Sequence, residues 1–298
     1  MFSTTRRRQA LAVGGTLTVC ALAACSSGIT LSAAPTPSNH RPERIVAAPK
    51  NLRSAAEPQP NGTIWTLAGD GATRALWEFN LAGGKKPIGA KPVSNAAQSI
   101  AESLTGVIGV ALGTSRSGAL ELLNGSTGVV SRTVPIGAPA RQVVVGSDGS
   151  TFYVLNGTPA SASVTIVNSA NGRTLGTVPV PLDTVSVVPD VQEATVYALQ
   201  PSGVVSQIAV AGGKIMSNFR TGTGGRSIAL SPDGNTLYVL KGAMTAPNVA
   251  VIDVATASVQ RVLPAPANCL QILVSASGGE LYQMVGTPGY GNIQVFAS

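Results

Sequence analysis

The sequence predicts an all-β fold in which small antiparallel sheets repeat around a closed ring, and three observations support this. Residues 226–264 contain three or four short apolar runs that alternate with polar residues and end in turn residues, the pattern of neighbouring antiparallel strands. The same residue types recur at equivalent positions along the chain, with a nearly constant spacing. The 34 Gly and 20 Pro among the 298 residues fall in phase with that repeat, as a series of tight turns requires.

The repeat is clearest at an aromatic position in the second run of each unit. Steps of 44, 44, 44, 41 and 44 residues connect the equivalent positions, which are Trp65, Gly109, Tyr153, Tyr197, Tyr238 and Tyr282. Repeats of roughly 40 to 50 residues with four strands each are typical of a β-propeller. We therefore expect a six-bladed β-propeller of four-stranded antiparallel blades, with seven blades as the alternative.

Other fixed positions in the repeat suit a four-stranded hairpin sheet. Asp148-Gly149 and Asp233-Gly234 predict positive-φ turns between the first and second strands. An Asn or Asp fifteen residues after the aromatic position can bond its own backbone and begin a turn, as at Asn80, Asn124, Asn168 and Asp253. Proline near the end of the fourth strand requires a sheet edge, so this strand is predicted to be outermost, at Pro135, Pro179 and Pro264.

Two segments carry a resemblance to a known family. Ser231-Pro-Asp-Gly-Asn-Thr-Leu-Tyr-Val-Leu240, followed by residues 249–256, resembles the YVTN-type β-propeller repeat, and residues 152–155 with 164–168 form a weaker copy. The resemblance covers about residues 43–298, although the first two units and the fourth are degenerate. It implies a propeller fold and an extracytoplasmic location, and it implies no single function.

The N-terminus is predicted to be an export signal, residues 1–24. Arg6-Arg7-Arg8 precede an apolar run that ends at Ala24 and is too short to span a bilayer as a mature helix. Leu22-Ala23-Ala24-Cys25 resembles the lipobox of bacterial lipoproteins, which implies cleavage before Cys25 and acylation of its thiol, for example by palmitate. A plain secretory signal with an incidental cysteine is the alternative, and both the Sec and the Tat export routes remain open.

The rest of the chain divides into a tether and one folded domain. Residues 25–42 are rich in Ser, Thr, Pro and Ala without an apolar period, so they predict a flexible tether between the cell membrane and the domain. Residues 43–298 are predicted to form the propeller. The last repeat ends after its third strand, near 292–296, whereas a strand-like run at residues 44–48 precedes the first repeat. Pairing of these two strands would complete the sixth blade and close the ring.

Charge and residue types exclude several classes of function. From residue 54 onward 13 basic residues face 12 acidic ones, without a cluster of Lys, Arg and aromatic residues, so we expect no nucleic-acid partner. His40, the single histidine, lies in the predicted tether, which excludes His-dependent catalysis and His metal sites on the domain. No calcium, Walker or dinucleotide motif is present, so no metal or cofactor is expected. Cys269, in an apolar run, predicts a buried free thiol.

One set of polar residues is predicted to face the central channel. Arg53, Arg141 and Arg226 share a register at the start of the innermost strand in blades one, three and five, which would arrange them as a triangle. Gln98 and Gln271 fall one residue later in blades two and six, and Asp183 falls near the same level in blade four. Guanidinium groups suit carboxylate and phosphate ligands. The alternative is that these arginines bond neighbouring backbone carbonyls, with Asp183 neutralising one of them.

Together these patterns predict a lipid-anchored protein on the extracytoplasmic face of the cell membrane. Its propeller is expected to be a non-catalytic binding or scaffolding module of the cell envelope, for a small anionic ligand or an acidic partner segment. A lactonase-like hydrolase or a lyase with its site at the channel is the alternative, and Asp183 or a channel glutamate would then be the general base. A structural partner of other envelope proteins, which would need an exposed apolar patch, is a third class.

Overall fold

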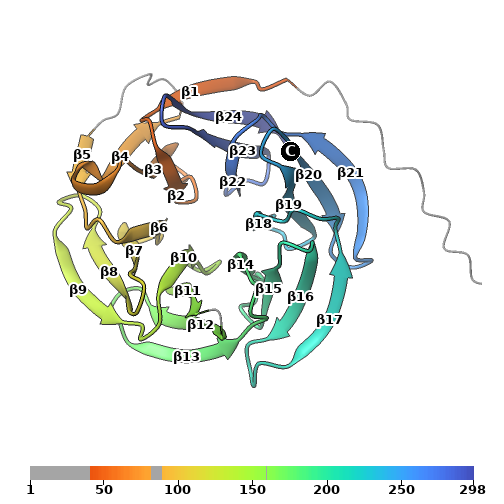
Figure 1. The fold of residues 1–298 in the computed structure, drawn as a ribbon, viewed down its shortest axis with the longest axis horizontal. Helices are drawn as coiled ribbons and strands as arrows, with labels where there is room; N and C mark the ends of the chain where they lie inside the picture. The colour runs from red at the N-terminus through yellow and green to blue at the C-terminus, as the bar shows by residue number, and fades with distance from the viewer. Residues whose placement is uncertain (1–40, 82–88, 159) are drawn as a thin grey trace, which may run out of the picture. The chain divides into compact units, whose positions relative to one another are not determined.

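The computed structural model describes residues 41–81, 89–158 and 160–298. Among these residues, 24 strands form six four-stranded antiparallel sheets that stand as blades around a ring, a β-propeller (Figure 1). The predicted fold class and the count of six blades are confirmed, and the alternative of seven blades is wrong. The predicted signal, Cys25 and the tether up to residue 40 lie outside the described residues. No helix in the described ranges has the length and hydropathy of a membrane span.

Each blade uses four strands in chain order, from the channel outward, except the sixth. Blades 1 to 3 consist of β2 (Leu52–Ala55), β3 (Thr63–Ala68), β4 (Ala75–Asn80) and β5 (Gly89–Pro92); β6 (Ala97–Glu102), β7 (Val107–Gly113), β8 (Gly118–Asn124) and β9 (Val130–Pro135); and β10 (Ala140–Val145), β11 (Thr151–Thr158), β12 (Ser161–Asn168) and β13 (Thr174–Pro179). Blades 4 to 6 consist of β14 (Ser186–Pro189), β15 (Thr195–Leu199), β16 (Val204–Ala209) and β17 (Ile215–Arg220); β18 (Ser227–Leu230), β19 (Thr236–Ala243), β20 (Ala246–Asp253) and β21 (Ser258–Pro264); and β22 (Cys269–Val274), β23 (Glu280–Gly286), β24 (Gly291–Ala297) and β1 (Arg44–Ala48).

The residues that repeat in the sequence hold equivalent places in the blades. Gly149 and Gly234 have φ angles of 70° and 75° in the turns between the first two strands, as predicted. Asp253 accepts a hydrogen bond from the backbone N–H of Thr256 at 2.7 Å, which begins the turn after the third strand. The repeated prolines lie in the outermost strands β9, β13 and β21. These three predictions are confirmed.

The core lies between the blades. Side chains of the second and third strands face those of the adjacent blade, so each apolar cluster joins two sheets. The aromatic position contributes to these clusters: Trp65 and Tyr153 are almost fully buried. In blade 2, where Gly109 takes this position, the ring of Phe152 from blade 3 packs against the glycine, and an added Cβ would meet that ring at 3.2 Å. Cys269 is a buried free thiol, as predicted.

The N-terminal strand closes the ring. β1 pairs antiparallel with β24, with Arg44 opposite Val295 and Ala48 opposite Gly291, which confirms the predicted closure. Val46 of β1 is buried in the cluster that joins blades 6 and 1. Arg44 also forms an ion pair with Glu280, 2.5 Å between Nη2 and Oε1. Closure therefore combines backbone pairing, apolar burial and one ion pair.

A second closed circuit runs around the channel through the innermost strands. In each blade one Ser or Gln side-chain oxygen accepts a hydrogen bond from a backbone N–H of the next blade. The acceptors are Ser54, Ser99, Gln142, Ser186, Ser227 and Gln271, and the donors are Ile100, Val143, Val187, Ile228, Ile272 and Ala55, at 2.8–3.3 Å. The inner edge of each blade has no further strand to pair with, so these bonds satisfy N–H groups that would otherwise lack a protein partner.

The circuit uses glutamine at two places and serine at four. Gln142 bridges blades 3 and 4, and Gln271 bridges blades 6 and 1. The innermost strands of these two pairs approach each other least closely. The longer glutamine side chain spans the wider gap, and Gln271 also donates to the carbonyl of Ala55 at 3.1 Å. Residue choice thus follows the spacing between blades.

We predict that deleting residues 43–48 lowers the melting temperature by at least about 5 °C and promotes aggregation, because it exposes the edge of β24 and the apolar contacts of Val46. Thermal unfolding and size-exclusion chromatography measure both effects. Deletion of residues 32–37, in the predicted tether, is the control of equal length. An unchanged melting curve and a monodisperse product after the first deletion would contradict closure by this strand.

We also predict that Gln271→Ala destabilises the fold by about 1–3 kcal/mol, because it leaves the N–H and carbonyl of Ala55 without their side-chain partner. Gln260→Ala, at an exposed position of the outer strand β21, is the matched control and should change stability by less than about 0.5 kcal/mol. Denaturant unfolding measures both. Equal effects of the two substitutions would show that the inner circuit contributes nothing.

Candidate functional site in the central channel

A small polar cavity of about 130 Å³ lies where the innermost strands begin. Two consecutive residues from each of the six blades line it. They are Arg53 and Ser54, Gln98 and Ser99, Arg141 and Gln142, Val185 and Ser186, Arg226 and Ser227, and Leu270 and Gln271. The second residue of each pair belongs to the hydrogen-bonded circuit. The structure therefore brings five of the six predicted site residues to one cavity, which we call the arginine mouth.

In four of the six blades the first residue of the pair comes from an irregularity in the strand, whereas Val185 and Arg226 directly precede the regular strands β14 and β18. Leu52 pairs with Ala68 and Ser54 with Leu67, so Arg53 is left over as a bulge. Equivalent register shifts occur at Gln98, Arg141 and Leu270. A bulge turns its side chain away from the regular alternation of the strand. The bulges thus turn these side chains toward the arginine mouth.

Two details of the sequence alignment between blades are corrected by these bulges. Gln98 occupies the same bulge position as Arg53 and Arg141, not a position one residue later. Gln271 does follow the bulge, and both ends of its amide bond the backbone of Ala55. Arg53 and Gln98 are 45 residues apart, whereas the aromatic positions of the same two blades are 44 residues apart. A fixed repeat length could not resolve this shift.

Asp183 lies apart from the other predicted residues. It is exposed in the turn before β14 and does not line the arginine mouth. Val185 takes the position that arginine holds in blades 1, 3 and 5. The expectation that Asp183 lies near the level of the arginines fails because the turn of residues 181–184 carries it outside the start of the strand.

The three arginines differ in how far they are already engaged. Arg53 donates from Nε to the Gly69 carbonyl and pairs with Asp70, each at 3.3 Å. Arg226 donates from Nη1 to the sulfur of Met244. Its Nε and Nη2 are buried and have no hydrogen-bond partner among the described residues. Arg141 has neither a hydrogen bond nor an ion pair within the described part of the chain, and it is exposed.

Burial lowers the pKa of Arg141 and of Arg226. Because the ordinary pKa of arginine is about 12.5 or higher, both guanidinium groups stay charged at neutral pH. Partial removal from water without a carboxylate partner raises the electrostatic energy of each charge. The arginine mouth therefore holds two cations with donors that lack an acceptor among the described residues, and Asp70 neutralises the third.

The opposite end of the channel contains a larger cavity of about 450 Å³. Its wall includes the residue three positions after each acceptor of the hydrogen-bonded circuit. These six residues are Glu57, Glu102, Val145, Pro189, Leu230 and Val274. Blades 1 and 2 thus contribute carboxylates, and the other four blades contribute apolar side chains. We call this site the acidic cavity.

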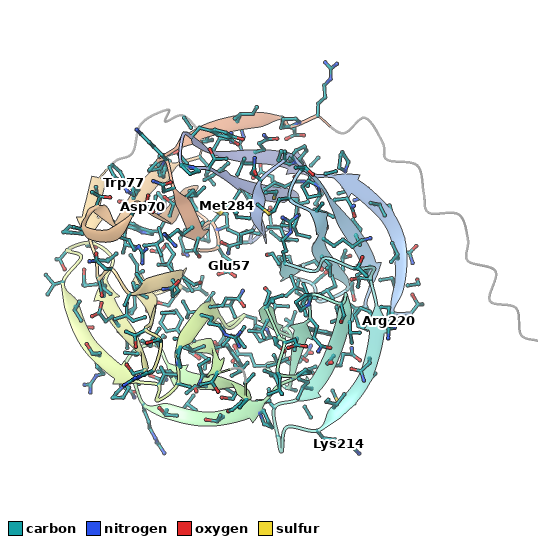
Figure 2. The ribbon with its side chains drawn as sticks, in the orientation of Figure 1. Glu57, Asp70, Trp77, Lys214, Arg220 and Met284 are labelled. Atoms are coloured by element: carbon teal, nitrogen blue, oxygen red, sulfur yellow. The ribbon has the colours of Figure 1, made fainter. Side chains whose placement is uncertain are left out.

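The two glutamates are held out of water. Glu102 is only 8% exposed, and its Oε2 has no hydrogen-bond partner among the described residues. Oε2 of Glu57 is likewise buried and unpartnered within the same ranges. Figure 2 shows Glu57 inside the ring of innermost strands. Burial raises the pKa of Glu57 to about 7. Burial, followed by the charge of Glu78, raises the pKa of Glu102 to about 7.

The sequence prediction did not include these two glutamates, although a signal was present. Glu57 and Glu102 are 45 residues apart, the same spacing as Ser54 and Ser99, and each lies three residues after one of these serines. Counting from the inner strands instead of the aromatic position would have aligned the two carboxylates.

Comparison with known proteins supports the fold alone. No protein-family model and no curated protein matches the chain, so the YVTN-type resemblance stays a prediction. The solved structure of Kuenenia stuttgartiensis hydrazine synthase is similar, with a TM-score of 0.62 and 14% identity over 83% of this chain and 75% of that chain. The β-propeller domain of Myceliophteria thermophila Cps50 (Swd1) has a TM-score of 0.59 and 10% identity over 87% and 99% of the two chains.

The raised pKa values of Glu57 and Glu102 predict a specific pH dependence of stability. Below about pH 4.5 both carboxyls are protonated in the folded and unfolded states, so their contribution to the stability of the fold is fully present. Between about 4.5 and 7 the unfolded chain releases protons that the folded chain retains. The free energy of unfolding therefore falls as the pH rises through this window, and this contribution levels off above it.

The double substitution Glu57→Gln with Glu102→Gln removes this dependence. We expect it to raise the melting temperature relative to the wild type at pH 8 and to leave it nearly equal at pH 4.5. Glu43→Gln, at an exposed glutamate outside the cavity, is the control and should leave the pH profile unchanged. Melting curves from pH 4 to 9 measure the effect, and parallel curves for the double variant and the wild type would refute it.

Proposed function

We propose that this protein is an extracytoplasmic lipoprotein whose propeller binds an anionic group at the arginine mouth, without catalysis. The observation that carries the proposal is the state of Arg226: two buried N–H-bearing nitrogens without a partner among the described residues, on the wall of a cavity that Arg141 shares. Buried donors without acceptors are unfavourable. An oxyanion would supply the missing acceptors.

The shape and charge of the arginine mouth support a small anionic group as the ligand. A cavity of about 130 Å³ matches the size of one carboxylate or phosphate group. Guanidinium groups form charge-assisted hydrogen bonds to both kinds of group. Because the chain from residue 54 onward is nearly neutral, the field of Arg141 and Arg226 is local to this mouth.

The small size of the cavity also favours a group that belongs to a larger partner. An acidic side chain or a C-terminal carboxylate of an envelope protein could enter the mouth while the rest of the partner lies on the surrounding loops. Loops on a rigid ring are common carriers of binding function. The proposed module would then recognise an acidic segment and hold it at the membrane.

Anchoring through Cys25 would place the module close to a membrane. A flexible tether of the predicted length has a root-mean-square extension on the order of 20 Å, which keeps the ring near the bilayer surface while it can still reorient. A partner bound at the arginine mouth would be concentrated at that surface. The proposal joins a binding site with a location, and each part can be tested alone.

We predict that Arg226→Ala weakens anion binding at least tenfold, which corresponds to the loss of about 1.5–3 kcal/mol for a charge-assisted hydrogen bond. Isothermal titration at low salt with inorganic phosphate, citrate and a tetraglutamate peptide measures the affinity. Arg220→Ala is the matched control, because Arg220 lies at the outer rim of blade 4 (Figure 2). Its affinity should equal that of the wild type.

The structural alternative gives the opposite pattern. If the arginines serve only the fold, no probe binds, and Arg226→Ala lowers the melting temperature as its single effect. Absence of binding by all three probes to the wild type at low salt would overturn the proposed function. Equal loss of affinity in Arg220→Ala would show that general surface charge, and not the arginine mouth, attracts the anions.

For the anchor, we predict that the mature chain begins at an acylated Cys25 and sediments with membranes. Cys25→Ala should prevent acylation and release the protein into the soluble fraction or leave its signal uncleaved. Metabolic labelling with palmitate and mass spectrometry of the N-terminal peptide measure the modification. A soluble wild-type protein whose N-terminus lies elsewhere would disprove the anchor.

A further inference from the structure

The acidic cavity has a two-sided wall. Of its six equivalent inner-strand positions, the two acidic ones are in adjacent blades, and the four apolar ones follow around the ring. Pro58 and Leu104 add apolar surface beside the two glutamates, and Val191 adds it in blade 4. A ligand that fits both sides must combine a group that bonds carboxylates with a hydrocarbon body. The cavity volume of about 450 Å³ is large enough for a compact organic molecule.

The charges on the wall have one sign. Glu57, Glu102, Asp148 and Asp190 line the acidic cavity, and the described residues that line it include no lysine or arginine. Asp190 accepts a hydrogen bond from the N–H of Thr195, and Asp148 from that of Ser150, so these two carboxylates stabilise turns. Glu57 and Glu102 differ from them, because each presents a buried Oε2 without a hydrogen-bond partner among the described residues.

We propose that the acidic cavity binds a primary ammonium group carried on a compact hydrocarbon body. The ammonium group lies at Glu57 and Glu102, and the hydrocarbon packs against Val145, Leu230 and Val274. An ammonium group has three N–H donors and no acceptor, so it matches buried carboxylate oxygens that have no donor partner among the described residues. Its positive charge also allows both glutamates to ionise, which their burial otherwise opposes.

Other ligand classes fit less well. The described residues contain no group of three or more His, Cys, Asp or Glu that could hold a metal ion, so a bare divalent cation lacks ligands there. A neutral apolar ligand would leave the two carboxylate oxygens unpaired, and a quaternary ammonium would supply charge without a donor. An anion would meet four carboxylates. This site is at the other end of the channel from the arginine mouth, so the two proposals stand independently.

Three related probes test this inference on the full chain in a non-ionic maltoside detergent. Benzylammonium carries the charge and the donors, benzyltrimethylammonium carries the charge alone, and benzyl alcohol has neither the charge nor the ammonium donors. We expect benzylammonium to bind at least tenfold more tightly than the other two at pH 8 by isothermal titration. Equal affinity for benzyl alcohol would show that the hydrocarbon alone drives binding, and it would overturn the proposal. Equal affinity for benzyltrimethylammonium would also overturn it, because the N–H donors would then contribute nothing.

The pH supplies a second test. The titratable groups that face the site are Glu57, Glu102, Asp148 and Asp190, with Glu78 beside Glu102. Benzylammonium stays protonated from pH 5 to 8, whereas the two buried glutamates take up protons toward pH 5. Affinity should therefore fall at least tenfold between pH 8 and pH 5. An affinity independent of pH over this range would contradict ionised glutamates as the partners.

Substitution locates the binding. Glu57→Gln with Glu102→Gln should weaken the binding of benzylammonium at least tenfold at pH 8. The fold should be retained, because glutamine has the same shape as a protonated glutamate. Glu121→Gln is the matched control, since Glu121 is a partly buried glutamate of blade 2 outside the cavity. Its affinity should be that of the wild type. Unchanged binding in the double variant, or binding of Ca²⁺ in place of the amine, would refute the site.

Discussion

The hydrogen-bonded circuit of the innermost strands is the constraint on which the channel depends. A propeller blade has two edges, and the inner one faces the channel, where no further strand pairs with it in the described residues. Here a Ser or Gln side chain of each blade accepts from a backbone N–H of the next, six times around the ring. The circuit fixes the distance between neighbouring blades at the axis, so it also fixes which side chains can face one another across the channel.

The two ends of the channel follow from this circuit. The residue before each acceptor lines one mouth, directed there by a bulge in four of the blades, and three blades have arginine at this position. The residue three positions after each acceptor reaches the other cavity, and two blades have glutamate there. From Arg53 to Glu57 the chain advances four residues, which in an extended strand span on the order of 13 Å. Opposite charges are thus separated along one axis, and each site can select a ligand of opposite sign without neutralisation by the other.

Closure at the outside complements closure at the axis. β1 supplies the outer strand of the sixth blade, so the first described strand and the last are bonded to each other. The apolar clusters between blades then form a continuous ring, because each blade packs against two neighbours. A rigid ring of this kind holds the two ends of the channel at a constant separation. Binding at either mouth should therefore change loops and side chains more than the blades.

The sequence by itself determined the architecture of this protein. The aromatic positions, the Asp-Gly turns and the edge prolines are local requirements of hairpin sheets, so their phase predicted six blades and the pairing of residues 44–48 with the last repeat. It also predicted that Arg53, Arg141 and Arg226 meet at one mouth, because equivalent residues of a ring lie at one level. Local rules repeated in register are sufficient for this part of the structure.

Only the tertiary structure decided how individual channel residues are used. Bulges shift the register by one residue, so Gln98 joins the arginines, Gln271 bonds Ala55, and Asp183 lies outside the mouth. The partners of a side chain depend on the loops of its own blade: Asp70, in the loop after β3, engages Arg53, whereas Arg226 keeps two buried nitrogens without a partner among the described residues. The burial of Glu57 and Glu102 arises from packing between blades and has no signature in a single repeat. Contacts between distant segments set desolvation, and desolvation sets the chemistry of a buried charge.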